Sequence, residues 1–152
     1  MTNRYMTLTL GRDLCYVGTK ASALSALEAF VKSREVSVDG GDSVICYSAD
    51  NGVLTPRAIG IALEDIARYR DFDEIDTFAP PDEPGGFRLP PGKYGFVQLE
   101  SDADRVIEGE RLELLEYMNE KQLKGDMEHF YLRTISEEEK DVYQILIPIS
   151  GD

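Results

Sequence analysis

The sequence is poor in several residues that mark common functional classes. Its 152 residues include one histidine, two cysteines and no tryptophan. No serine or cysteine stands in a recognisable nucleophile motif that could use His129, so the sequence does not support a hydrolytic triad. Cys15 and Cys46 lack the C-x-x-C spacing of zinc and redox sites, and each lies in an apolar run. We interpret both as reduced structural thiols and expect no metal and no cofactor.

Basic residues are also scarce. Sixteen Lys and Arg stand against 29 Asp and Glu, which gives a net charge of −13. Proteins that bind nucleic acids directly neutralise phosphates with Lys and Arg, so this balance argues against that class. The acidic excess favours solubility first of all; the alternative is that it attracts a cationic ligand or a basic protein partner.

Long apolar stretches are the third absence. No run of about 20 apolar residues could cross a membrane, and residues 1–6 lack the apolar core of a signal peptide. We therefore expect a cytoplasmic protein without membrane contact. The length suits one domain, and a hydrophobic content of 42% is enough to build its core.

The N-terminal half predicts strands around one helix. Strands are expected over residues 5–10, 14–17 and 43–48, with a helix capped by Ser22 that runs to about Arg34, and turns at Asp39-Gly40-Gly41 and Asn51-Gly52. Residues 58–63 fit either a strand or a short helix, and we expect a strand. Residues 69–78 have no clean apolar face, which favours a charged edge strand. Residues 79–86 contain three prolines and two glycines and are predicted to be a linker.

The C-terminal half repeats this plan. A strand is expected from near Lys93, then an amphipathic helix capped by Ser101 and ended by Gly125, strands over Met127–Arg133 and Val142–Ile147, and a charged connection over residues 135–141. Tyr16-Val17 matches Phe96-Val97 at an offset of 80 residues, just before each helix. Such a match indicates an internal repeat.

A family resemblance rests on the order of motifs in this half. Leu89-Pro90-Pro91-Gly92-Lys93-Tyr94, a helix, Glu128 and Ile145-Leu146-Ile147-Pro148-Ile149 follow one another. In this order the chain resembles the gyrase-inhibitor-like (GyrI-like) small-molecule-binding family. That family includes the effector-binding domains of multidrug-responsive transcription regulators of the BmrR type, here without a DNA-binding module.

The resemblance implies an α+β fold. Two strand-helix-strand-strand modules would be related by a pseudo-two-fold axis, with antiparallel sheets, helices on one side and a ligand cleft between the modules. In one domain spanning residues 1–152, module one would cover about 5–78, the linker 79–86 and module two about 87–149.

The resemblance also suggests site residues. It gives Glu128 the role of a cleft carboxylate that pairs with cationic aromatic ligands. The alternative is a solvent-facing strand residue that pairs with Arg133 or Lys93. The family commonly has an aromatic hydroxyl two residues after this Glu, where the present chain has Phe130, followed by Tyr131. The expected ligand-binding residues are Glu128, Tyr131, Tyr47, Tyr94, Tyr16 and Phe130, with Tyr47 and Tyr131 the leading tyrosines.

Three functions remain open. The first is a stand-alone sensor or sequestering protein for lipophilic or cationic molecules, which fits best and needs no catalytic residue. The second is a small-molecule hydrolase, in which Glu128 is the general base and Tyr47 or Tyr131 the acid or orienting group. The third is an acidic inhibitor of a nucleic-acid enzyme such as a topoisomerase, in which the negative charge meets a basic protein partner.

Overall fold

A computed structural model describes residues 4–137 and 140–150, and within them one eight-stranded sheet carries two α-helices. The elements in chain order are β1 (Met6–Leu10), β2 (Leu14–Lys20), η1 (Ala21–Ala23), α1 (Leu24–Ser33), β3 (Val38–Asp50), β4 (Val53–Leu63), η2 (Ile66–Asp71), β5 (Gly85–Leu89), β6 (Gly92–Leu99), α2 (Asp104–Glu120), β7 (His129–Glu137) and β8 (Lys140–Pro148). All the ladders between these strands are antiparallel. The predicted α+β class is confirmed.

The strand order shows the pseudo-two-fold relationship directly. The sheet runs β1-β6-β8-β7-β3-β4-β2-β5. If β1 is exchanged with β5, β2 with β6, β3 with β7 and β4 with β8, the result is the same strand order read from the other edge of the sheet. The two strand-helix-strand-strand units are β2-α1-β3-β4 and β6-α2-β7-β8, and they meet where β3 pairs with β7.

The edge strands are exchanged between the two units. β1, which leads into β2, pairs with β6, and β5, which leads into β6, pairs with β2. Tyr16 therefore lies opposite Phe87, and Phe96, 80 residues after Tyr16, lies opposite Met6. The internal repeat that these positions predicted is present in the pairing of the strands.

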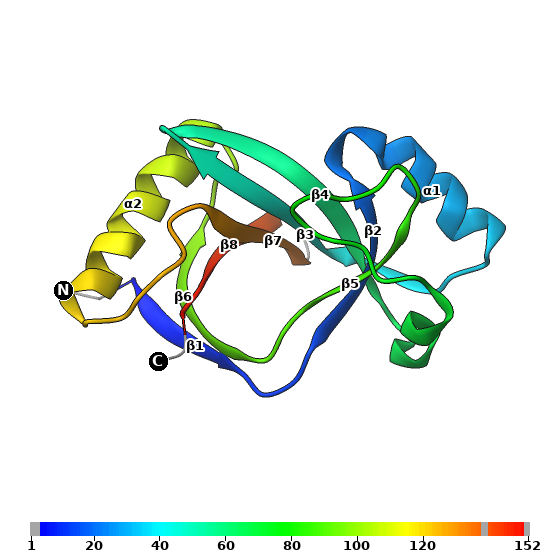
Figure 1. Cartoon of the computed structure of the whole chain (residues 1–152), viewed down its shortest axis with the longest axis horizontal. Helices are drawn as coiled ribbons and strands as arrows, with labels where there is room; N and C mark the ends of the chain where they lie inside the picture. Colours follow the sequence, from blue (N-terminus) through cyan, green and yellow to red (C-terminus); the bar gives the residue numbers. More distant parts are fainter. Residues whose placement is uncertain (1–3, 138–139, 151–152) are drawn as a thin grey trace.

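Both helices pack on the same face of the sheet, α2 beside one unit and α1 beside the other (Figure 1). Ile107, Leu114 and Met118 of α2 are fully buried against β6, β7 and β8. Burial of a side chain of this size stabilises the fold by about 1.5–3 kcal/mol. The helix α1 buries only Leu27 fully, between Val17 of β2 and Leu63 of β4.

The helix ends differ from the sequence-based expectation. Ser22 lies in η1, and α1 follows Ala23 without a side-chain cap. Likewise Ser101 precedes α2, where its hydroxyl accepts a hydrogen bond from the Ala103 N–H at 3.2 Å. Both serines were close to the right place, but 3-10 and extended turns come between them and the first α-helical residue.

The helix α2 ends before the predicted stop at Gly125. Gln122 has a φ of 60°, in the left-handed region, and the Leu123 N–H donates to the Met118 carbonyl at 2.8 Å. This geometry closes the helix at Glu120 by satisfying one of its last carbonyl groups. A Cβ at Gly125 would lie 2.5 Å from the end of the Met118 side chain and 3.2 Å from that of Leu115, so glycine allows the close packing at this position.

Three connections are also different. The expected turn at residues 39–41 is an irregularity inside β3, where the register with β4 shifts. The charged connection over 135–141 lies mostly in the β7–β8 ladder, in which Ile135 faces Val142 and Glu137 faces Lys140; residues 138–139 lie outside the described part. β5 begins at Gly85, inside the predicted linker. The edge strand predicted over 69–78 is wrong, since η2 occupies its start and only Glu74 forms a single bridge, to Gly86.

Candidate functional site

The sheet face opposite α1 and α2, called the aromatic face below, collects aromatic side chains from both units. Tyr16 and Phe87 stack with ring centroids 5.6 Å apart, and Tyr94 meets Tyr131 edge to face at 6.3 Å. Their cluster also contains Val44, Cys46, Ala58, Ile75, Leu89 and Leu146. A face built from β2, β3, β4, β5, β6, β7 and β8 is thus an apolar surface shared between the two halves of the sheet.

Residues 73–84, called the covering segment, reach this face through Ile75 and Phe78. Ile75 is buried and Phe78 half-buried in the same cluster. The Phe78 ring is 4.2 Å from the His129 ring and 5.8 Å from the Tyr131 ring, measured between centroids. The Ile75 N–H donates to the Gly86 carbonyl at 2.9 Å, which ties the segment to β5.

A hollow of about 300 Å³ adjoins the covering segment, and Arg57, Phe78 and Pro80 are among its lining residues. The basic side chains on its wall are engaged elsewhere. Lys20 pairs with Asp82 of the covering segment, and the Arg57 Nε donates to the Ser48 hydroxyl at 3.1 Å. Phe78 therefore stands between this hollow and the aromatic face.

An ion pair crosses the junction of the two halves on the aromatic face. The Arg133 guanidinium donates to both oxygens of Asp42, at 3.0 and 2.7 Å, and the Tyr16 hydroxyl donates to Asp42 at 3.4 Å. The hydrogen bonds that Arg133 donates to Asp42, together with the negative charge of that carboxylate, raise the pKa of Arg133 despite burial. Burial, together with Asp42, raises the pKa of Tyr16 above its ordinary value. Tyr16 is therefore a neutral hydrogen-bond donor at physiological pH.

Two other tyrosines of the face are held in the same protonated state. Burial raises the pKa of Tyr94 to about 12, and the Tyr94 hydroxyl donates to the Pro90 carbonyl at 2.6 Å. Burial also raises the pKa of Tyr131, an effect that a hydrogen bond with Thr77 of the covering segment partly offsets. These phenols offer apolar rings with a polar hydroxyl, which suits recognition of an amphipathic molecule.

The structure separates the tyrosines that the sequence placed first. In an antiparallel ladder, residues directly opposite each other lie on the same face. Tyr47 is opposite Phe130, and Cys46 is opposite Tyr131. Tyr47 and Phe130 accordingly stack under α2, 5.1 Å apart, with the Arg111 guanidinium 5.8 Å from the Phe130 ring. Tyr16, Tyr94 and Tyr131 share the aromatic face.

Glu128 is exposed and lies in the bend immediately before β7. The strand predicted over residues 127–133 contained it, whereas β7 begins one residue later, at His129. Its carbonyl accepts a hydrogen bond from the Ala49 N–H at 2.7 Å, and Asp126 caps the N–H groups of Glu128 and His129 at 2.8 and 2.9 Å. Arg133, one of its expected partners, pairs with Asp42 instead. Glu128 is therefore an exposed residue next to His129, at the start of β7.

The residues that sequence reasoning missed are Phe78, Phe87, Asp42, Arg133 and His129. Phe87 offered a signal, since it stands at the start of the strand before the Leu89–Tyr94 motif. Phe78 offered a weaker one, as an aromatic residue directly before the Pro-rich stretch. No group of three His, Cys, Asp or Glu side chains in residues 4–137 and 140–150 could hold a metal ion, and no helix there is long and apolar enough to span a membrane.

Comparisons with known proteins agree on the fold. No protein-family model and no curated protein sequence matches this chain. Among solved structures, the EcmrR C-terminal domain is similar over 100% of both chains, with a TM-score of 0.66 and 8% identity. A hydrolase encoded by lin2189 from Listeria innocua is similar over 97% of this chain and 92% of its own, with a TM-score of 0.60 and 13% identity.

A third similar structure contains a ligand. SAV2435 bound to tetraphenylphosphonium matches 98% of this chain and 95% of its own, with a TM-score of 0.55 and 14% identity. The likenesses extend over nearly the whole chain in all three cases, while the identities lie far below the level at which function can be transferred. The chain has the fold of these domains, and the GyrI-like resemblance is confirmed at the level of the fold.

Proposed function

We propose that this chain is a small-molecule-binding protein whose ligand occupies the aromatic face between Tyr94, Tyr131 and the covering segment. The observation that carries the proposal is the meeting of aromatic side chains from both halves beneath the covering segment. Phe78 occupies the place of an aromatic ligand ring against His129 and Tyr131. SAV2435, which shares the fold, binds tetraphenylphosphonium, an aromatic cation.

We further propose a preference for lipophilic cations. Two carboxylates lie close to Phe78 and its neighbour His129: Asp76 accepts a hydrogen bond from the Phe78 N–H at 3.0 Å, and Asp126 lies 3.5 Å from the His129 Nδ1. The exposed Glu128 directly precedes His129 in the chain. A net charge of −13 adds a general attraction for cations. The roles fit a cytoplasmic sensor or sequestering protein for multiple drug-like compounds, and the two free cysteines suit a reducing compartment.

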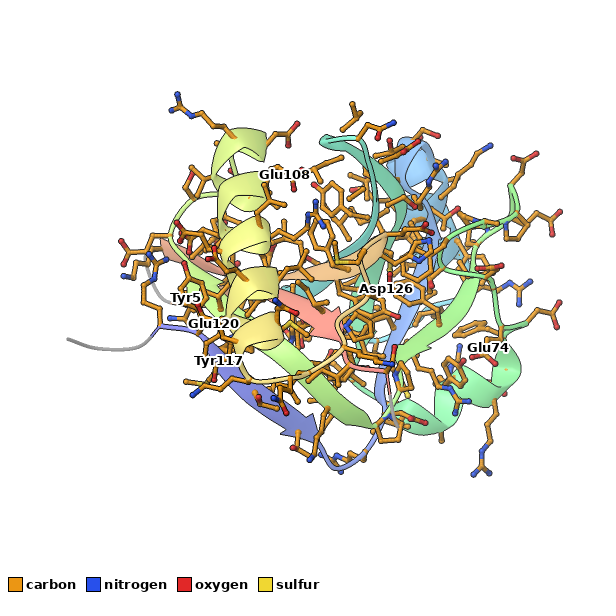
Figure 2. The ribbon with its side chains drawn as sticks, turned by 60° about the vertical axis from the view of Figure 1, so that its left-hand side comes forward. Tyr5, Glu74, Glu108, Tyr117, Glu120 and Asp126 are labelled. Carbon is orange, nitrogen blue, oxygen red and sulfur yellow. The ribbon has the colours of Figure 1, made fainter. Side chains whose placement is uncertain are left out.

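A thermal-shift titration with tetraphenylphosphonium tests this function. A ligand that binds only the folded state stabilises it by about 2.7 kcal/mol when its concentration is 100 times its Kd. For a chain of this size, each kcal/mol raises the melting temperature by about 2–4 °C. We expect a clear shift for wild type and a smaller one for Glu128→Gln. The matched control is Glu120→Gln, because Glu120 lies at the C-terminal end of α2, away from Asp126 (Figure 2). No shift at any concentration would reject ligand binding at this face.

Hydrolysis is the second candidate function, and its support is the likeness to the hydrolase from Listeria innocua. In this reaction Glu128 would take a proton from the attacking water, and the neutral Tyr131 phenol would donate to the leaving group. Product formation from compounds that bind in the thermal-shift assay, lost in Glu128→Gln and in Tyr131→Phe, would establish catalysis. Binding without turnover would leave the protein a binder.

A basic protein partner is the third candidate. The exposed side of α2 carries Glu113, Glu116 and Glu120, which give it strong negative charge. Association through this surface would weaken steeply between 50 and 300 mM salt, roughly as expected when the Debye length shortens from above to below 10 Å. An affinity that does not depend on salt would exclude it.

A further inference from the structure

The two edge strands of the sheet differ in what lies beside them. β5 pairs with β2 on one side, and on the other side the Ile75 N–H donates to the Gly86 carbonyl while the Gly86 N–H donates to the Asp73 carbonyl, both at 2.9 Å. β1 occupies the equivalent place at the opposite edge and pairs with β6. Within residues 4–137 and 140–150 no second segment pairs with β1. The outer backbone groups of β1 are therefore open to a further strand.

The residues of β1 do not protect this edge. Exposed edge strands usually contain charged residues, proline or a β-bulge, which discourage pairing with another chain. β1 consists of Met6-Thr7-Leu8-Thr9-Leu10, and its register with β6 is continuous. It contains no charged residue, in a chain in which 30% of the residues are charged. Thr7 and Thr9 are exposed and β-branched, a residue type that favours strand pairing. β1 thus has the composition of a strand with a neighbour on both sides.

A hollow of about 350 Å³ lies where β1 begins, on the side of the sheet that carries α2. Its wall is formed by Tyr5, Glu113, Glu116, Tyr117, Glu120 and Lys121. The rings of Tyr5 and Tyr117 are 6.1 Å apart between centroids, and Figure 2 shows both beside Glu120 at the end of α2. The Lys121 Nζ is 5.9 Å from the centroid of the Tyr117 ring. An ammonium group of the chain itself is thus already placed against this aromatic wall.

The charge of the hollow selects the kind of group that fits it. Glu113, Glu116 and Glu120 are exposed and follow one another at spacings of three and four residues, so they share one side of α2. Three carboxylates against the single ammonium of Lys121 leave the wall negative. Carboxylates and the faces of tyrosine rings both attract ammonium and guanidinium groups. A Lys or Arg side chain therefore matches the hollow in charge and in the apolar length of its stem.

The same charge distinguishes between two occupants of the edge. A second copy of the chain would bring a further net charge of −13 and its own acidic α2 to the contact, and like charges oppose such pairing. A basic segment is attracted both by the hollow and by the exposed side of α2. Charge complementarity therefore favours a basic partner over self-association.

We propose that β1 is a docking edge for an extended basic segment of a partner protein, which adds a strand to the sheet and places a Lys or Arg side chain in the hollow beside Tyr5 and Tyr117. Strand addition is a general mode of peptide recognition, in which backbone hydrogen bonds supply affinity and side-chain pockets supply specificity. The proposal rests on the third candidate function and gives that basic partner a binding place and a backbone conformation. The hollow is separate from the small-molecule site, which lies on the opposite face of the sheet.

A calorimetric titration with a synthetic peptide tests this docking edge. A blocked peptide of about eight alternating Lys and Thr residues is long enough to span β1. We expect it to bind at about 50 mM salt, where surface charges are weakly screened. The same peptide with a methyl group on every backbone nitrogen keeps its charge but cannot donate strand hydrogen bonds. Its affinity should be at least about tenfold lower, as expected from the loss of about two hydrogen bonds.

Two double variants with the same change in charge locate the site. Glu116→Gln, Glu120→Gln removes two carboxylates from the wall of the hollow. We expect it to bind the peptide about threefold to tenfold more weakly, the effect of two exposed ion pairs. Glu28→Gln, Glu64→Gln is the matched control, since both residues are exposed and belong to the other half of the chain. The control should lose less than about twofold in affinity, because salt screens charges at this distance.

The docking edge is overturned if the peptide does not bind, or if methylation of its backbone leaves the affinity unchanged. Equal binding of both peptides would keep the third candidate function and remove strand pairing at β1. Equal losses in the two double variants would overturn the hollow as the binding place, because overall charge would then account for the attraction. Sedimentation of the protein alone provides the last check, because a dimer that binds no peptide would assign the edge to a second copy of the chain. The tetraphenylphosphonium titration judges the small-molecule function separately.

Discussion

Asp42 of β3 and Arg133 of β7 form a two-pronged ion pair across the line where the two halves of the sheet meet. Their side chains are 18% and 22% exposed, so water screens the pair only partly. An ion pair therefore stabilises the central β3–β7 ladder in addition to its backbone hydrogen bonds. The pair lies beside Tyr16, whose hydroxyl donates to Asp42.

Removing one partner of this pair should destabilise the protein more than removing both. Arg133→Met leaves the Asp42 carboxylate partly buried without its guanidinium, and we expect a loss of about 2–3 kcal/mol in the free energy of unfolding. The double variant Asp42→Asn, Arg133→Met should recover at least about 1 kcal/mol of that loss. Urea unfolding of the four proteins of the cycle gives the coupling energy directly; additive losses would show that the pair contributes nothing specific.

Phe78→Ala should increase ligand affinity while costing little stability. The Phe78 ring is half-exposed but competes with a ligand ring for the place against His129 and Tyr131. We expect the Kd for tetraphenylphosphonium to fall severalfold, since the binding-competent fraction rises. Calorimetric titration measures the affinity, and Phe72→Ala is the control, because Phe72 packs on Phe30 beside α1. Weaker binding by Phe78→Ala would instead make Phe78 part of the ligand contact.

The two cysteines should differ strongly in reactivity. Cys46 is fully buried under the covering segment, whereas Cys15 is partly exposed. Burial raises the pKa of both thiols, and the effect is larger for Cys46. Only the thiolate reacts with disulfide reagents. We expect one thiol to react quickly and the second only when the segment opens, with faster reaction of the second in Phe78→Ala. Equal rates in both proteins would mean that Cys46 is reached by another route.

Alkaline pH should weaken the fold through the buried tyrosines. The pKa of Tyr94 is raised from its ordinary value to about 12. The unfolded chain therefore loses this proton first, so the stability is complete below pH 10 and is lost as pH rises toward 12. Each such tyrosine should lower the free energy of unfolding by about 1.4 kcal/mol per pH unit in this window. Tyr94→Phe should flatten the decline measured by urea unfolding at pH 9–11, at the cost of the hydrogen bond to Pro90.

Two glycine substitutions should act in opposite directions. An alanine Cβ at position 18 would lie 2.6 Å from the Ile59 carbonyl oxygen and would overlap the Phe87 ring, so Gly18→Ala should destabilise by about 1–3 kcal/mol. Gly109 lies inside α2 with nothing within 4 Å of its Cβ position, so Gly109→Ala should stabilise by about 0.5–1 kcal/mol. Thermal unfolding compares both; a stable Gly18→Ala variant would show that Phe87 can move aside.

The parts of the fold that local sequence patterns specify were predictable. Asn51-Gly52 forms the predicted tight turn between β3 and β4, with both residues at positive φ. The apolar run Val142–Ile147 forms the interior strand β8, between β6 and β7. Tyr16 and Phe96 occupy matching places because the repeat places the same alternation before each helix.

Non-local choices were not predictable in the same way. β1 pairs with β6 and β5 pairs with β2, and no local sequence pattern specifies these partner strands. Tyr47 and Tyr131 lie on opposite faces of the sheet because the β3–β7 register pairs Tyr47 with Phe130. A shift of this register by one residue would exchange the faces, and no local pattern fixes the register. Residues 69–78 alternate without an apolar face, and the burial of Ile75 and Phe78 there depends on a surface made by distant strands.

The exchanged edge strands have a consequence for how the chain folds. Because β1 completes the sheet of the second unit and β5 that of the first, neither unit can close its own edge alone. A fragment ending near residue 84 would expose the unpaired side of β2, and its β1 would have no strand to join. The two halves should therefore unfold in one cooperative transition, and β1, the first strand of the chain, gains its ladder partner only once β6 has been made.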